Sequence, residues 1–91
     1  SLRKEYSMRK MTPNEQIDMQ ANVLYHLSLA MGEEAAMKLV DVKVPKDETL
    51  MDAVMEDIKT SSDWEENGHY NDDDVRLAIG RVMMKLCHIE F

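Results

Sequence analysis

The sequence predicts a small all-α (mostly α) domain of three to four helices, and three observations support this fold class. Residues with good helix-capping side chains begin three stretches of the chain, at Thr12, Asp47 and Asn71. Apolar residues follow each of them at spacings of three and four, the period of a helix with one buried face. The length of 91 residues leaves room for one small core. We therefore expect residues 12–91 to form a single helical domain.

The first predicted helix spans residues 13–31, and a longer helix that continues to residue 41 is the alternative. Thr12 is the expected N-cap, and Glu15 completes a capping box, in which each of these two side chains bonds the backbone N–H of the other residue. Gly32 either ends this helix or is tolerated within the longer one.

The first helix is more apolar than one buried face requires. From Ala21 to Val40, thirteen of the twenty residues are apolar. Small side chains also recur every seven residues from Ala21, and such a column permits close approach between helices. We therefore predict a homodimeric helical bundle built on this helix. The predicted dimer interface comprises Ile17, Ala21, Leu24, Leu27, Ser28 and Met31.

Residues 40–44 change the pattern, because apolar and polar residues alternate there with the period of a strand. A short strand and a fraying helix end are the two interpretations. Pro45 closes the segment, since the residue before a proline avoids the helical region. The second predicted helix spans residues 47–61, with Asp47 as its N-cap. Its buried face comprises Leu50, Val54 and Ile58.

The third predicted helix spans residues 72–88 and has the clearest start in the chain. Asn71 is the expected N-cap, and three aspartates follow in the first turn, where the helix dipole favours negative charge. Tyr70 is placed to pack against Val75 as a hydrophobic staple. The predicted apolar stripe comprises Val75, Ala78, Ile79, Val82, Leu86 and Ile89.

The net charge of −7 is distributed unevenly along the chain. Residues 47–74 contain eleven acidic residues and a single base, Lys59. Such a surface repels phosphate, which disfavours nucleic acid and favours a protein partner with a basic surface. The predicted partner surface comprises Glu65, Glu66, Asp72, Asp73 and Asp74.

Three further features concern the cellular environment. Residues 1–11 carry a basic cluster without helical period, so we expect a flexible basic N-terminal arm. The sequence contains neither a signal-peptide pattern nor an apolar run of membrane-spanning length. The single cysteine, Cys87, excludes an internal disulfide and a multi-cysteine zinc site. We therefore expect a cytoplasmic protein that does not associate with membranes.

Residues 63–74 carry oxygen-bearing side chains at a spacing that resembles the calcium-binding loop of EF-hand proteins. In that family, oxygen ligands occupy loop positions 1, 3, 5, 9 and 12, with glycine at position 6. Gly68 stands at position 6 here, while Asp74 replaces the usual bidentate glutamate. The alternative is the acidic first turn of a capped helix, which requires no cofactor. The resemblance implies a Ca²⁺ or Mg²⁺ site with the ligands Asp63, Glu65, Asn67, Asn71 and Asp74.

Residues 40–88 resemble ribbon-helix-helix DNA-binding regulators in the order of their elements. A strand, a proline, an amphipathic helix, a glycine-containing loop and a capped helix follow one another. In that family two chains pair their strands, and outward strand side chains, here Asp41 and Lys43, read the major groove. The family also sets its second helix against phosphate, where this chain has three aspartates. The resemblance implies a dimeric DNA-binding regulator as the alternative function.

Side chains suited to catalysis are few and scattered. His26, His69 and His88 fall on separate predicted elements, without the spacing of a catalytic or metal motif. Cys87 and His88 are adjacent on a helix, so their side chains point about 100° apart and make a poor nucleophile and base. The sequence therefore predicts a non-enzymatic interaction or regulatory protein that self-associates and presents an acidic surface to a partner protein.

Overall fold

The computed structural model describes residues 10–44 and 47–90, the last four of them as backbone alone. Within these ranges the chain is mostly helical, so the predicted fold class is confirmed. Apart from Lys10 and Met11, the predicted arm at residues 1–11 lies outside the described residues.

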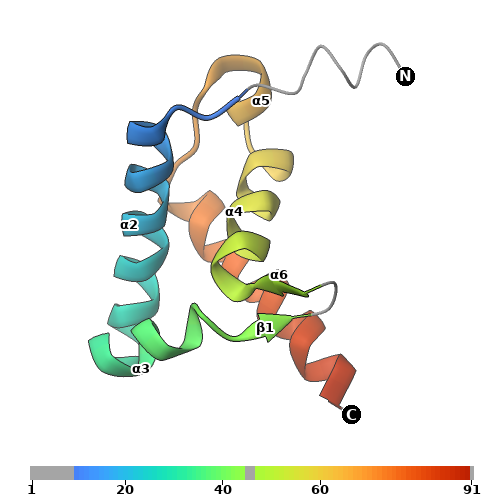
Figure 1. The fold of residues 1–91 in the computed structure, drawn as a ribbon. Helices are drawn as coiled ribbons and strands as arrows, with labels where there is room; N and C mark the ends of the chain where they lie inside the picture. Colours follow the sequence, from blue (N-terminus) through green and yellow to red (C-terminus); the bar gives the residue numbers. More distant parts are fainter. Residues whose placement is uncertain (1–9, 45–46, 91) are drawn as a thin grey trace.

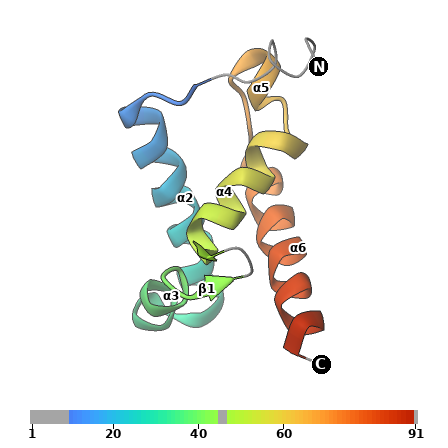
Figure 2. The same ribbon diagram turned by 45° about the vertical axis from the view of Figure 1, so that its right-hand side comes forward.

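Three long helices pack against one another, and shorter elements occupy both ends (Figures 1 and 2). The long helices α2 (Pro13–Met31) and α6 (Asp72–Glu90) run in one direction, and α4 (Leu50–Ser61) runs in the other. The short helix α5 (Trp64–Asn67) lies at one end, while α3 (Glu33–Leu39) and a small hairpin lie at the other. The elements in chain order are α2 (Pro13–Met31), α3 (Glu33–Leu39), β1 (Lys43–Val44), β2 (Glu48–Thr49), α4 (Leu50–Ser61), α5 (Trp64–Asn67) and α6 (Asp72–Glu90).

Two of the three predicted helix starts are confirmed by their hydrogen bonds. The backbone N–H of Glu15 donates to Thr12 Oγ1 at 3.2 Å, and the N–H of Thr12 donates to Glu15 Oε1 at 2.9 Å. At the start of α6, the N–H groups of Asn71 and Asp74 each donate to the side chain of the other residue at 2.9 Å. Both starts are therefore reciprocal capping boxes, which satisfy N–H groups that a helix leaves unpaired.

The predicted N-cap of the second helix, Asp47, is wrong. The cap is Thr49, whose Oγ1 accepts from the N–H of Asp52 at 3.1 Å. Asp47 instead has a positive φ of 64° and directly precedes β2. The helix starts later because Thr49 pairs with Lys43 across the β1–β2 hairpin.

Gly32 ends the first helix, so the longer helix to residue 41 is ruled out. Its φ of 92° lies in the region that favours glycine, and its N–H donates to the carbonyl of Ser28 at 2.8 Å. The helix α3 begins at Glu33 and packs back against α2.

The strand predicted at residues 40–44 is present only at Lys43–Val44. It pairs antiparallel with Glu48–Thr49 of the same chain, whereas the ribbon-helix-helix resemblance implied pairing between two chains. The carbonyls of Val40 and Val42 accept the N–H groups of Met51 and Leu50 at 3.1 and 2.8 Å. The segment before the strand therefore satisfies N–H groups at the start of α4. Asp41, which the strand prediction placed on the same strand as Lys43, lies in a turn.

One cluster of buried side chains joins α2, α3, α4 and α6. The predicted buried residues of α4 are in it, as are Val75, Ala78 and Val82 of the predicted α6 stripe. Ile79 packs against the cluster partly buried, and Leu86 is partly buried but is not part of it. Ile89 lies outside the described side chains. The buried stripe of α2 differs from the apolar stripe that we assigned to the dimer, since only Leu27 belongs to both. The cluster comprises Met19, Val23, Leu27, Ala36, Leu50, Val54, Met55, Ile58, Val75, Ala78 and Val82.

Candidate functional site

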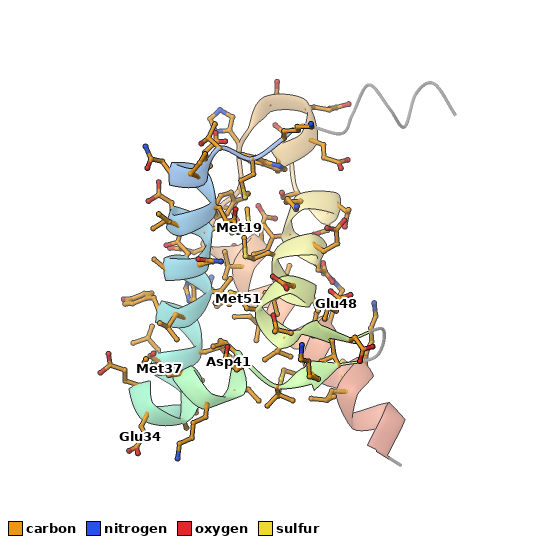
Figure 3. The ribbon with its side chains drawn as sticks, in the orientation of Figure 1. Met19, Glu34, Met37, Asp41, Glu48 and Met51 are labelled. Carbon is orange, nitrogen blue, oxygen red and sulfur yellow. The ribbon has the colours of Figure 1, made fainter. Side chains whose placement is uncertain are left out.

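The first candidate surface is an exposed apolar face of α2 that carries a groove. The groove has a volume of about 370 Å³, and three segments of the chain line it. Met51 from α4 and Asp41 from the turn after α3 lie on the side where α2 passes α4 (Figure 3). We call this surface the α2 face. Its groove is lined by Ile17, Gln20, Ala21, Leu24, Val40, Asp41 and Met51.

Local backbone geometry places the segments that line the groove. The break at Gly32 turns the chain back along α2, so that Val40 and Asp41 follow beside it. The N–H of Met51 donates to the carbonyl of Val40 at 3.1 Å, which holds the first turn of α4 against the turn after α3. The backbone conformation therefore holds the segments that line the groove beside one another.

Most of the predicted dimer interface remains at the surface of the single chain. Ile17, Ala21 and Met31 are exposed, with Ile17 at 61 %, while Leu24 and Ser28 are partly buried. Leu27 is the exception, because it is only 2 % exposed and belongs to the core of its own chain. It lies one helical turn after Val23 and therefore points to the same buried side. We remove Leu27 from the candidate interface on this ground.

The second candidate surface is the segment 63–74, which we call the acidic end. Its short helix α5 begins at Trp64, which is 2 % exposed, and stops at Gly68 with a positive φ of 72°. The helix α5 packs against α4. Glu65 is partly buried and Glu66 is exposed.

Two side-chain contacts attach the acidic end to α2. Asn22 Nδ2 donates to the hydroxyl of Tyr70 at 3.0 Å. His26 Nε2 lies 3.3 Å from Asp72 Oδ1, and the His26 side chain is largely buried. These contacts join residues far apart in sequence and hold the start of α6 beside α2.

The three aspartates that begin α6 differ in their surroundings. The side chains of Asp72 and Asp73 are each 73 % exposed, and Asp73 pairs with Arg76 one turn later. Asp74 is partly buried, and its carboxylate accepts the N–H of Asn71 in the capping box. Asp72 and Asp73 are therefore accessible to a partner, whereas Asp74 stabilises the helix.

One acid of the 47–74 segment is matched by a base from another helix. Arg81 Nη2 donates to Asp57 Oδ1 at 2.6 Å, and Arg81 Nε donates to both carboxylate oxygens at 3.1 Å. The hydrogen bonds that Arg81 donates to Asp57 raise the pKa of Arg81 above its ordinary value, so the guanidinium stays charged. The pair links α4 to α6 and neutralises Asp57.

Of the five predicted cation ligands, Glu65 and Asn67 lie on α5, and Asn71 and Asp74 lie at the start of α6. Residues 64–67 form α5, and Asn67 Nδ2 donates to Asp63 Oδ2 at 2.8 Å. The side chains of Asn71 and Asp74 are engaged in the capping box. Among the described residues, three or more His, Cys, Asp or Glu side chains nowhere gather in a geometry suited to a metal ion. Binding of Ca²⁺ or Mg²⁺ stays a prediction from the sequence.

Sequence reasoning missed the helix α5 and the residues of the groove outside α2. A signal for α5 existed, since Gly68 follows Trp64 at the distance of a one-turn helix with a glycine cap. Val40 and Met51 carry no such signal, because only the folded chain brings them beside α2.

Comparisons with protein-family models, curated proteins and solved structures gave no match to this chain. Within the described ranges, every helix is too short or too polar to cross a membrane. The two surfaces are therefore the basis for the functional argument.

Proposed function

We propose that this chain is a non-enzymatic interaction protein that self-associates and binds a basic protein partner through its acidic end. The observation that carries the proposal is the exposure of Asp72 and Asp73, at 73 % each. They lie in a segment, residues 47–74, with eleven acids and one base. The local contacts with His26 and Arg76 leave most of both carboxylate surfaces open to solvent.

The charge of the acidic end favours one class of partner. Exposed carboxylates attract a surface rich in Lys and Arg, which accelerates encounter and selects against acidic partners. The same charge repels the phosphates of nucleic acid. A protein with a basic surface is therefore the partner that fits.

The acidic end is held in place before a partner arrives. The capping box of Asn71 and Asp74 orders the first turn of α6, and the contacts of Asn22 with Tyr70 and of His26 with Asp72 attach that turn to α2. An ordered surface loses less conformational entropy on binding than a mobile one. Asp72 and Asp73 are thus displayed at a defined position.

The test replaces Asp72 and Asp73 together with asparagine and measures binding of a synthetic helical peptide with Lys and Arg on one face. Asparagine removes the charge and keeps a side-chain oxygen that can face His26. We expect the dissociation constant to rise about tenfold, because two exposed ion pairs are each worth up to about 1 kcal/mol. Fluorescence anisotropy of the labelled peptide gives the constant.

The matched control replaces Glu33 and Glu34 with glutamine. These two acids are exposed in the first turn of α3, so the control removes the same charge from an equivalent helix position. We expect a change of less than about twofold. Equal weakening by both double variants would show that net charge alone attracts the peptide, and it would overturn the assignment of the acidic end.

A further inference from the structure

We propose that His26 makes the acidic end sensitive to pH, because protonation of its imidazole pairs it with Asp72 and weakens binding of the basic partner. This inference rests on the partner binding in the proposed function, and it adds how that binding is regulated. It follows from the burial of His26, from its distance to Asp72 and from the charges around the pair.

His26 is a buried titratable side chain that reaches the acidic end from α2. Only 7 % of its side chain is exposed, and its Nε2 lies 3.3 Å from Asp72 Oδ1. The rings of Tyr25 and His26 meet edge to face, with centroids 5.3 Å apart and planes inclined at 72°. One turn earlier on α2, Asn22 Nδ2 donates to the hydroxyl of Tyr70 at 3.0 Å. These contacts hold the imidazole and the start of α6 in fixed positions beside each other.

The contact between His26 and Asp72 has two states that differ in charge. Histidine is the side chain whose charge ordinarily changes between about pH 5 and about pH 8. A neutral imidazole donates at most one hydrogen bond, and the carboxylate beside it keeps its full negative charge. An imidazolium places a positive charge 3.3 Å from Asp72 Oδ1. The pair then carries no net charge, so the attraction of Asp72 for a distant base decreases.

The other charged groups around the pair form their contacts elsewhere. On α6, Arg76 lies one turn after Asp72 and pairs with Asp73. The helices α3 and α4 also pack against α2, and in the described part of the chain their charged side chains form no ion pair with His26. Asp72 is therefore the acid whose charge His26 offsets. The charged residues of those two helices are Glu33, Glu34 and Lys38 on α3 and Asp52, Glu56, Asp57 and Lys59 on α4.

The charge on His26 affects one of the two carboxylates that we assign to the partner. Asp72 and Asp73 are each 73 % exposed, so a basic side chain reaches both of them while His26 is neutral. Once His26 is protonated, a basic partner competes with the imidazolium for Asp72. Acidification therefore weakens binding before the carboxylates themselves take up protons, which ordinarily happens below about pH 5.

The test measures binding of the labelled helical peptide, with Lys and Arg but no His, at about pH 8 and about pH 5.5 and at constant ionic strength. Fluorescence anisotropy gives the dissociation constant. We expect the constant of the wild type to rise about threefold on acidification, because one exposed ion pair is weakened. Each variant is compared with itself at the two pH values, so a change in its affinity at the higher pH does not affect the comparison.

Two variants remove the proposed response in different ways. His26→Gln keeps a hydrogen-bond donor without a titratable charge, and its constant should change less than about 1.5-fold between the two pH values. Asp72→Asn keeps a side-chain oxygen and should bind more weakly at about pH 8, with little further loss on acidification. Far-UV circular dichroism checks that both variants stay helical.

The matched control is His69→Gln, which removes an exposed histidine from the acidic end itself. This variant should keep most of the rise in the dissociation constant. A wild-type constant that is the same at both pH values would overturn the proposal while partner binding stands. A rise that His26→Gln keeps and His69→Gln abolishes would also overturn it, because His69 would then be the responsive group. Absence of peptide binding at both pH values would overturn the proposed function itself.

Discussion

The α2 face and the acidic end differ in almost every property that governs recognition. The α2 face is apolar, has a groove, and has Asp41 as the one charged residue of its lining. The acidic end places Asp72 and Asp73 in solvent, and its residues 63–74 include six acids and no Lys or Arg. Under the proposed function the two surfaces suit different kinds of contact, because the α2 face carries one charge in its groove, Asp41, whereas the exposed carboxylates of the acidic end suit a basic protein.

The largest effect is expected from removal of the residue that anchors the acidic end. Trp64→Ala should lower the free energy of unfolding by about 4 kcal/mol, because it empties a buried aromatic site. Urea denaturation followed by circular dichroism measures this change. Trp64→Phe keeps part of the apolar volume and should lose less. If Trp64→Ala lost under about 1 kcal/mol, α5 would not be anchored by this side chain.

The two sides of α2 should respond differently to truncation of a leucine. Leu27→Ala should cost about 3 kcal/mol of stability, because Leu27 belongs to the core. Leu24→Ala should cost less stability and should weaken self-association, because Leu24 lines the groove. Urea denaturation at submicromolar concentration separates stability from dimerisation. Equal losses of stability in the two variants would contradict the division of α2 into a buried and an exposed apolar side.

Substitution of Asn71, the N-cap of α6, should lower the free energy of unfolding less than the truncations of Trp64 and Leu27. Asn71→Ala should cost about 1 kcal/mol of stability, because it removes the acceptor for the N–H of Asp74. It should also weaken binding of the basic peptide, since the first turn of α6 frays, and it should leave the dimer unchanged. Asn71→Asp keeps a capping oxygen and should retain the stability, as thermal unfolding will show.

The smallest effect is expected at Gly80, within α6 and away from both surfaces. A Cβ added there would meet nothing within 4 Å, and the residue is exposed. Gly80→Ala should therefore stabilise the chain by about 0.5–1 kcal/mol, because alanine is the better helix former. Thermal unfolding measures the gain. A loss of self-association in this variant would show instead that α6 forms the copy–copy contact.

Features of the fold that depend on neighbouring residues could be predicted from the sequence. The capping boxes at Thr12 and Asn71 join residues three apart, so local reasoning was sufficient. The cap at Asp47 was mispredicted because Thr49 is held by pairing with Lys43, a contact across the hairpin. A helix of four residues, such as α5, is too short to show a helical period.

The candidate surfaces were predictable to different degrees. The acids of the acidic end are consecutive in the chain, so their clustering could be read directly. On α2, two apolar stripes lie next to each other, and periodicity alone does not say which of them faces the core. Leu27 was therefore assigned to the wrong side. The groove also depends on Val40 and Met51, which reach α2 only through the break at Gly32 and the start of α4.

We propose that the two surfaces bind different partners by different forces, and the salt dependence of each interaction distinguishes those forces. Peptide binding and dimerisation are both measured as ionic strength rises from about 0.01 M to about 0.15 M, over which the Debye length falls from about 30 to about 8 Å. We predict that binding of the basic peptide weakens, because exposed charges are screened. Dimerisation should hold or strengthen, because screening reduces the repulsion between two copies of net charge −7. Weakening of both interactions would contradict this division between the two surfaces.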